Sequence, residues 1–279
     1  MKPHHAPAPL ALSAQDIGRA ATLSLYDELA LSPKPGLVTL TCRGSHDDMD
    51  AHTFMRSLLA LRGYYVRMAE LGAHRARFDA LERCGIAAEA RMLAATRGIN
   101  THRGAIFMLG LLCAAAGAVG RRASPAELRA TLLALWGPAL AARAQRPSTL
   151  PGGQAAQRYQ LRSASAEAAL GFPTLFETTE PALRQRLSGG LARSTARLDA
   201  LFATIAVLDD SNLAHRGGLA GLRHAQAQAR AFLAAGGAGR PGGLQAAAAI
   251  GRDFVQRRLS PGGAADTLAA ACWLQRMGE

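Results

Sequence analysis

The sequence predicts an all-α protein that folds as a single compact multi-helix domain around a buried central helix at about residues 104–119. Aromatic residues make up only 5% of the 279 residues, while Ala, Leu and Arg are abundant, and this composition favours helix over sheet. Apolar residues recur at spacings of three and four, and no strand-like alternation persists. Residues 104–119 carry no charge, and a helix that is apolar on every side is a buried one.

The domain limits follow from composition. Residues 1–12 are rich in His, Pro and Ala and lack the apolar core of a signal peptide, so we expect a disordered leader followed by one all-helical domain at 13–279. The uncharged segment is short for a membrane span and has charged neighbours, so no membrane partner is expected. The cysteines are widely spaced with no C-x-x-C pair, which is typical of reduced thiols in a cytoplasmic protein.

The first helix is expected to begin after Ser13 and to end before Pro33. Prolines then bracket Lys34, and each proline restricts the backbone around it, so the lysine side chain should have a fixed direction. Lys34 is also the only lysine besides Lys2, and a compact ammonium suits phosphate oxygens better than a spread guanidinium does. The alternative is an ordinary loop with an exposed lysine.

An acidic segment precedes the next helix. His46 is followed by Asp47, Asp48 and Asp50, and Asp50 is placed to cap the helix that begins near residue 51. Asp47 and Asp48 are adjacent, so their side chains diverge and only one of them enters a given site. Carboxylates with a nearby histidine suit Mg²⁺ that is shared with substrate phosphates. The alternative is a solvated acidic loop.

A further helix is expected at about 78–97, and the central helix after it begins with Asn-Thr-His-Arg-Gly at residues 100–104. A first helical turn has free N–H groups and the positive end of the dipole, so it can hold an anion. His102 and Arg103 are unfavourable there unless a negative group lies opposite. The alternative is a cap by Asn100 or Thr101 with a solvated Arg103.

The middle of the chain contains a helix started by Ser124 and Pro125, an irregular region at 146–175 that resembles a substrate-covering loop or a joint, and a helix at about 191–208. That helix is expected to end in an acidic cluster at 209–212, and acids at a helix C-terminus oppose the dipole. We therefore interpret the cluster, which contains Asp210 and Asn212, as a cation site. The next helix is expected from about residue 219.

The last two helices are expected near 244–258 and 263–277. Ser260 is placed to cap the final helix, and Gly262 and Gly263 leave its first turn without side chains, so that a ligand can approach the backbone. Asp266 lies beneath this face, one turn further on. The segment predicts a seat for phosphate and Mg²⁺, and the alternative is a capped helix packed against a neighbour.

A net charge of +12 favours a phosphate-bearing or other polyanionic partner. The sequence contains no P-loop, no G-x-G-x-x-G after a strand, and no H-E-x-x-H or G-x-S-x-G motif. It also lacks an aromatic platform for single-stranded nucleic acid, so no nucleic-acid partner is expected.

Together, these motifs resemble those of the triphosphoribosyl-dephospho-CoA synthases, from about Ile17 to about Trp273. The matching segments occur in the family order, at 33–38, 44–49, 100–107, 210–212 with 216–218, and 260–266. The resemblance implies an all-helical transferase that joins ATP and 3′-dephospho-CoA, releases adenine and forms 2′-(5″-triphosphoribosyl)-3′-dephospho-CoA. The Thr39-Leu40-Thr41 continuation and the Gly-Ser-His-Asp-Asp-Met segment at 44–49 resemble the malonate decarboxylase-associated branch more than its citrate lyase-associated sister, and the Asp-Ser-Asn triplet departs from the common Asp-Thr-Asn. The downstream partner would be the system that transfers the group to an acyl carrier protein.

The reaction that the resemblance implies assigns roles to the motifs. Asp48, Asp210 and Asp266 are the expected catalytic residues and Mg²⁺ ligands, and which of them is the general base stays open. Lys34, His102 and Arg103 are expected to contact the phosphates. The remaining substrate-binding candidates are His46, Asn100, Asn212, Arg216, Gly262 and Gly263. The oligomeric state stays open, with a homodimer as one option.

Two other functions fit the same residues. One is a Mg²⁺-dependent helical hydrolase that cleaves N-glycosidic bonds of nucleotides, with water in place of the sugar hydroxyl. The other is a non-enzymatic basic module that binds RNA or an acidic protein, against which the carboxylate clusters argue because they would repel RNA.

Overall fold

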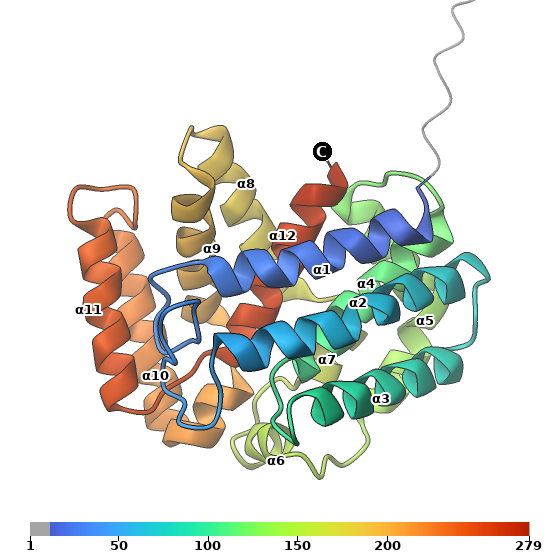
Figure 1. Ribbon diagram of the computed structural model, residues 1–279, viewed down its shortest axis with the longest axis horizontal. Helices are drawn as coiled ribbons and strands as arrows, with labels where there is room; N and C mark the ends of the chain where they lie inside the picture. The colour runs from blue at the N-terminus through green and yellow to red at the C-terminus, as the bar shows by residue number, and fades with distance from the viewer. Residues whose placement is uncertain (1–11, 279) are drawn as a thin grey trace, which may run out of the picture.

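The computed structural model describes residues 12–278, so the expected leader at 1–12 lies outside the described residues except for Leu12. The described chain contains helices and no β-strand, which confirms the all-α prediction (Figure 1). The elements, in order, are α1 (Ala14–Ala30), α2 (Ala51–Ala73), α3 (Phe78–Ala95), α4 (Arg103–Val119), α5 (Pro125–Ala144), α6 (Pro151–Arg158), α7 (Ala164–Ala169), the π-helix η1 (Thr174–Thr179), α8 (Glu180–Ser188), α9 (Arg193–Val207), α10 (Ser211–Ala234), α11 (Gly243–Gln256) and α12 (Gly262–Gly278).

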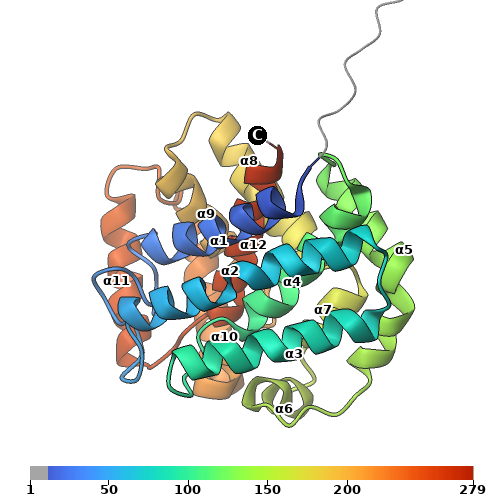
Figure 2. The ribbon, with the colours of Figure 1, turned by 45° about the vertical axis from the view of Figure 1, so that its right-hand side comes forward.

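Helix α4 is the buried central helix that the sequence predicts. Most of its residues from Ala105 to Gly117 are buried, and it packs against α2, α5, α12, α3 and α1. Figure 2 shows α1, α2 and α3 side by side, with α4 behind α2. Helix α12 is a second central element, since it contacts α1, α4, α8, α9 and η1. Its buried Trp273 donates from Nε1 to the Ile17 carbonyl at 3.2 Å.

Helices α2 and α4 touch backbone to backbone. A Cβ atom on Gly72 would lie 1.9 Å from the Ala114 carbonyl oxygen, and one on Gly117 would lie 2.0 Å from the Ala69 carbonyl oxygen. Only glycine fits at such distances, so these two residues allow the two helices to approach so closely. The relative position of α2 and α4 is therefore fixed by close packing.

Helix α10 differs from its prediction. It begins at Ser211, eight residues earlier than the expected position near 219, and Asp210 is its N-cap. The interpretation of residues 209–212 as an unfavourable acidic helix end is therefore wrong, because α9 ends at Val207 and the Asp210 carboxylate lies at the positive end of α10. The expected break appears as a kink, where Gly218 has φ 63° and ψ −170°.

The region at 146–175 is more regular than predicted. It contains α6 and α7, which pack against α10 and α5 respectively, followed by η1. Three predicted caps are confirmed, since Ser13, Asp50 and Ser124 each accept the backbone N–H three residues ahead. Among residues 12–278, no helix has the length and apolar character needed to cross a bilayer.

Candidate active site

Three loops meet beside the N-terminal ends of α10 and α12. The α1–α2 loop lies against the segment between α11 and α12, where Ser45 donates from Oγ to the Leu259 carbonyl at 2.5 Å. The segment before α10 reaches α12 through Asp210, whose Oδ2 accepts the Ala264 N–H. Figures 1 and 2 both show the α1–α2 loop beside α10 and α11. These contacts bring together motifs that are more than 200 residues apart.

Arg216 and His46 hold this junction together. Arg216 donates from Nε to the Arg258 carbonyl at 2.7 Å and from Nη2 to the Ser45 carbonyl. His46 Nε2 lies 2.9 Å from Ser260 Oγ, and burial lowers the pKa of the imidazole. Both residues were expected to bind substrate, and both bind neighbouring loops in the structure.

Asp210 joins the first turns of two helices. Its buried carboxylate accepts the Asn212 and Leu213 N–H groups at Oδ1, at 2.9 and 3.3 Å, and the Ala264 N–H at Oδ2, at 3.0 Å. Burial raises the pKa of Asp210, and the backbone N–H donors partly oppose that rise. Asp210 therefore fixes α10 against α12 with an acid that both helix dipoles stabilise.

The two glycines at the start of α12 face this cap. A Cβ on Gly263 would lie 3.1 Å from Asp210 Oδ2, and a Cβ on Gly262 would lie 2.9 Å from Asn212 Nδ2. The expected bare helical turn is present, but its nearest neighbours are side chains of the protein. Gly262, Gly263, Asn212 and Asp210 thus form one packed group at the α10–α12 junction.

Asp266 supplies the negative group that the start of α4 requires. A Cβ on Gly104 would lie 2.0 Å from Asp266 Oδ2, and the Ala105 N–H forms a hydrogen bond with the carboxylate. Burial raises the pKa of Asp266 well above its usual range, and the carboxylates of Glu28 and Asp210 raise it further. The acidic group at this helix N-terminus therefore belongs to the protein itself.

Lys34 is buried, and its side chain turns back onto the last turn of α1. Its ammonium donates to the Glu28 carbonyl at 2.7 Å and to Glu28 Oε1 at 2.5 Å. Burial lowers the pKa of Lys34, and the Glu28 carboxylate opposes that effect. The prediction of a fixed direction is confirmed, and the alternative of an exposed lysine is wrong.

Glu28 is a member of the site that the sequence analysis missed. It lies on the apolar face of α1 with Ala21 and Leu25, at helical spacing, and it is buried. An acid on an otherwise apolar helical face is the sequence feature that could have identified Glu28 as a buried polar residue.

His102 lies beside this pair and is uncharged at neutral pH. Its Nδ1 lies 2.6 Å from Ser57 Oγ, and its buried Nε2 has no hydrogen-bond partner among the described residues. Burial lowers the pKa of His102 to about 3, and the nearby Lys34 ammonium contributes to the decrease. The ring can therefore offer a substrate a hydrogen bond but no positive charge.

The remaining candidates lie further out. Asn100 Oδ1 accepts the Arg103 N–H at 3.1 Å, but the N-cap of α4 is His102. Arg103 forms an ion pair with Glu89 of α3 at 2.7 Å, so it is not the solvated residue of that alternative. The Asp48 side chain is 61% exposed, with its Oδ1 3.6 Å from His46 Nδ1. These residues surround the buried group and are not part of it.

The three candidate aspartates are not equivalent. Asp210 and Asp266 are close enough to influence one another, while Asp48 is at the exposed edge. Within residues 12–278, no group of three or more His, Cys, Asp or Glu side chains has the arrangement of a metal site. A cation at this site would therefore need oxygen ligands from a bound substrate as well as from the protein.

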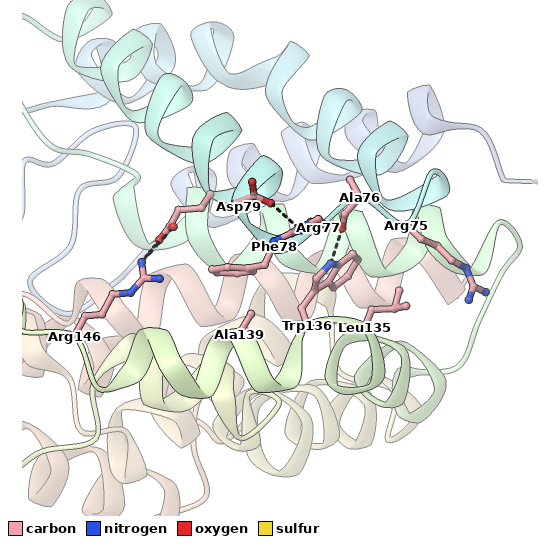
Figure 3. A pocket seen from close by; sticks show the side chains of 10 residues that line it. Arg75, Ala76, Arg77, Phe78, Asp79, Leu135, Trp136, Ala139 and Arg146 are labelled. Atoms are coloured by element: carbon pink, nitrogen blue, oxygen red, sulfur yellow. Dashed lines mark hydrogen bonds and ion pairs between the residues drawn. The ribbon is translucent and has the colours of Figure 1, made fainter.

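Two surface cavities lie elsewhere in the described chain. One of about 430 Å³ lies between the α2–α3 corner and α5, where the Trp136 indole donates to the Ala76 carbonyl and Arg75, Arg77 and Arg146 surround the opening (Figure 3). Another of about 600 Å³ lies between the start of α5 and the η1–α8 segment. Neither cavity is lined by Lys34, Asp210 or Asp266. The candidate site is therefore identified by the chemistry of its side chains and not by one of these two cavities.

Comparisons with known proteins bear on this arrangement. In Azotobacter vinelandii, a protein 41% identical over 263 residues covers 91% of this chain, which covers 88% of that protein. Relatives from Acinetobacter calcoaceticus and Pseudomonas aeruginosa are 36% and 40% identical, over 92% and 91% of this chain and 89% and 88% of their own lengths. All three carry the name "Probable 2-(5''-triphosphoribosyl)-3'-dephosphocoenzyme-A synthase". No solved structure matches the chain.

A family model described as "CitG: ATP:dephospho-CoA triphosphoribosyl transferase" matches residues 14–279. This range includes every site residue named above, and the predicted family resemblance is confirmed. The chain belongs to the CitG family of ATP:dephospho-CoA triphosphoribosyl transferases.

Proposed function

We propose that this chain transfers the 5-triphosphoribosyl group of ATP to the 2′-hydroxyl of 3′-dephospho-CoA, with release of adenine, and that the reaction takes place where α4, α10 and α12 begin. Family membership supports the reaction. The observation that carries the location is the buried group of Lys34, Glu28, His102, Asp210 and Asp266, which brings opposite charges and an unpaired ring nitrogen to one place.

The chemistry requires a proton acceptor. When a ribose hydroxyl displaces adenine at C1, the sugar carbon passes through an oxocarbenium-like state, and the hydroxyl must lose its proton. Asp210 is less suited to this role because its oxygens already accept three backbone N–H groups. Asp266 has the Ala105 N–H as its one hydrogen-bond donor among the described residues, so we assign the proton to Asp266.

The triphosphate requires positive charge and hydrogen-bond donors. Lys34 offers its ammonium, His102 offers a neutral ring nitrogen, and Arg103 offers a guanidinium that is 27% exposed beside Glu89. The ammonium suits the most buried phosphate oxygens because it is a compact charge. Arg103, at the edge, suits the solvent-facing end of the same chain of phosphates.

The donor set fits Mg²⁺ that is shared with a nucleotide. Mg²⁺ prefers oxygen ligands and is commonly held by one or two carboxylates together with substrate phosphates and water. The remaining lone pairs of Asp210 would hold it, and Asp48 would contribute from the edge of the site, which leaves Asp266 to accept the proton. Bound there, the cation would neutralise the triphosphate and reduce the repulsion among Glu28, Asp210 and Asp266.

We further propose that the product serves the malonate decarboxylase branch, with transfer to an acyl carrier protein as the next step in the cytoplasm. The support is the sequence from Thr39 to Thr41 and the Gly-Ser-His-Asp-Asp-Met segment at 44–49. Thr39 is buried, and its Oγ1 accepts the Thr41 and Cys42 N–H groups at 3.3 and 3.0 Å, so it closes the turn after Lys34. The names of the relatives specify the product and do not specify its recipient.

The test is to incubate the protein with ATP, Mg²⁺ and 3′-dephospho-CoA and to analyse adenine and the nucleotide product by mass spectrometry. We expect adenine and a product with the mass of 2′-(5″-triphosphoribosyl)-3′-dephospho-CoA, both dependent on the acceptor. Adenine release at the same rate without 3′-dephospho-CoA would instead indicate an N-glycosidic hydrolase. Salt-sensitive RNA binding without ATP turnover would indicate a binding module.

A further inference from the structure

We propose that Glu28 is a positioning residue of this active site, which holds the Lys34 ammonium in the orientation that the substrate phosphates require. The inference depends on the proposed location of the site. It concerns a residue that lies on α1, outside the motifs that define the other candidates.

Among the described residues, the Lys34 ammonium forms hydrogen bonds with Glu28 only. The ammonium donates two of its three N–H groups to the Glu28 carbonyl and carboxylate, at 2.7 and 2.5 Å. No described residue accepts the third N–H. One residue therefore fixes the nitrogen through two contacts and leaves one donor for a ligand.

Unsatisfied groups border the pair. Lys34 lowers the pKa of His102, whose buried Nε2 lacks a partner, and Glu28 raises the pKa of Asp266. The hydroxyl of Tyr65, another buried group near Asp266, also lacks a partner among the described residues. Buried polar atoms are nearly always paired in folded proteins, so these atoms indicate that a polar ligand completes the site.

Charge explains why an acid is required at position 28. A desolvated ammonium loses its proton readily unless an anion lies beside it, and Glu28 is the acid in contact with Lys34. The same carboxylate is unfavourable beside Asp266, because each negative charge disfavours the other. Glu28 is therefore needed to keep Lys34 charged, although it disfavours the charge on Asp266.

The neighbouring residue provides a matched control. Asp27 precedes Glu28 on α1 and is also mostly buried, but it forms ion pairs with Arg197 of α9 and Arg276 of α12. Asp27→Asn therefore removes a buried acid from the same helical turn without affecting Lys34. The double variant Glu28→Gln/Lys34→Met removes both charges of the proposed pair, so it leaves no unpaired buried charge that would prevent folding.

The experiment measures adenine release against ATP and 3′-dephospho-CoA concentration for the wild type, Glu28→Gln, Lys34→Met, the double variant and Asp27→Asn, with thermal unfolding of each. We expect Glu28→Gln to lower kcat about 10²-fold, as misplacement of a binding group does, with a much smaller change in KM. The double variant should match Lys34→Met, because Glu28 acts through the lysine. Asp27→Asn should lower the unfolding temperature and keep kcat within about twofold.

Three results would overturn the inference while leaving the proposed function intact. The first two are a wild-type kcat in Glu28→Gln and losses that multiply in the double variant. Equal losses of kcat in Asp27→Asn and Glu28→Gln would also overturn it, since both would then act through folding. A wild-type protein that releases no adenine in the presence of both substrates would overturn the proposed function, and the inference with it.

Discussion

Helices α2 and α4 run side by side, and the two ends of this pair have opposite chemistry. At the start of the pair, Ser57 and His102 form a buried polar contact, and a ring nitrogen has no partner. Further along, Gly72 and Gly117 bring the two backbones into contact with no polar side chain between them. The close-packed end holds the helices in place, and this allows the polar end to keep unsatisfied groups for a ligand.

The largest effect on activity is expected at the polar end, from the variant Asp266→Asn. Loss of the proton acceptor should lower the rate of adenine release by about 10²–10⁴-fold. The stability of Asp266→Asn should not fall with its activity. Since the folded-state pKa of Asp266 is raised, the charged carboxylate costs stability above its unfolded pKa, and asparagine removes this cost. Denaturant unfolding at pH 8 should therefore show an equal or higher midpoint. Full activity in Asp266→Asn would remove the residue from the mechanism.

The close-packed end should respond to Gly72→Ala with a loss of stability. The added methyl group would lie 1.9 Å from the Ala114 carbonyl oxygen, so α2 and α4 must move apart, at a cost of about 3 kcal/mol in the free energy of unfolding. Gly63→Ala, on the same helix with no atom within 4 Å of its new Cβ, should instead stabilise by up to about 1 kcal/mol. Equal unfolding midpoints for the two variants in urea would contradict the proposed backbone contact.

A smaller effect is expected in the free energy of unfolding, which should depend on pH because of His102 at the polar end. The pKa of His102 is about 3 in the folded protein and 6.5 in the unfolded chain. The stabilisation that the neutral ring contributes to the free energy of unfolding is therefore fully present above pH 6.5 and is lost as the pH falls toward 3. At pH 5.5, one unit below the unfolded value, the loss should be about 1.4 kcal/mol. Unfolding at pH 7.5 and 5.5 would measure it. His102→Gln should remove this component, whereas replacing the exposed His74 should not.

The smallest effect is expected at the edge of the site, from Asp48→Asn. This side chain is 61% exposed, and solvent screens its charge. We expect a change of about threefold in KM for ATP and little change in kcat, measured by adenine release. A loss as large as that of Asp266→Asn would mean that the acidic loop closes over the site when substrate binds.

The features that could be predicted from sequence are those that depend on neighbours along the chain. The uncharged segment identified the buried α4, the spacing of Asp50 identified its cap, and the two prolines identified a fixed Lys34. The error at Asp210 arose because only three residues separate α9 from α10, so an N-cap appeared to be a C-terminus.

Contacts across the fold were beyond sequence reasoning. The apolar face of α1 indicates that Glu28 is buried, and only the return of the chain through Lys34 shows which cation pairs with it. The motifs around Arg216 and His46 predict substrate ligands because the family resemblance assigns those motifs to the site. Their actual partners, the Ser45 and Arg258 carbonyls and the Ser260 hydroxyl, are known only once the loops are placed together.

The kink in α10 affects how this enzyme tolerates substitution. The residues that α10 contributes to the site, Asn212 and Arg216, precede Gly218, as does the capping Asp210. At φ 63° and ψ −170° the backbone of Gly218 adopts a conformation that is essentially confined to glycine. A survey of all single substitutions should therefore find position 218 as intolerant as the charged positions, although it has no side chain and no direct part in the chemistry. Designers who wish to alter acceptor preference would do well to leave that glycine untouched.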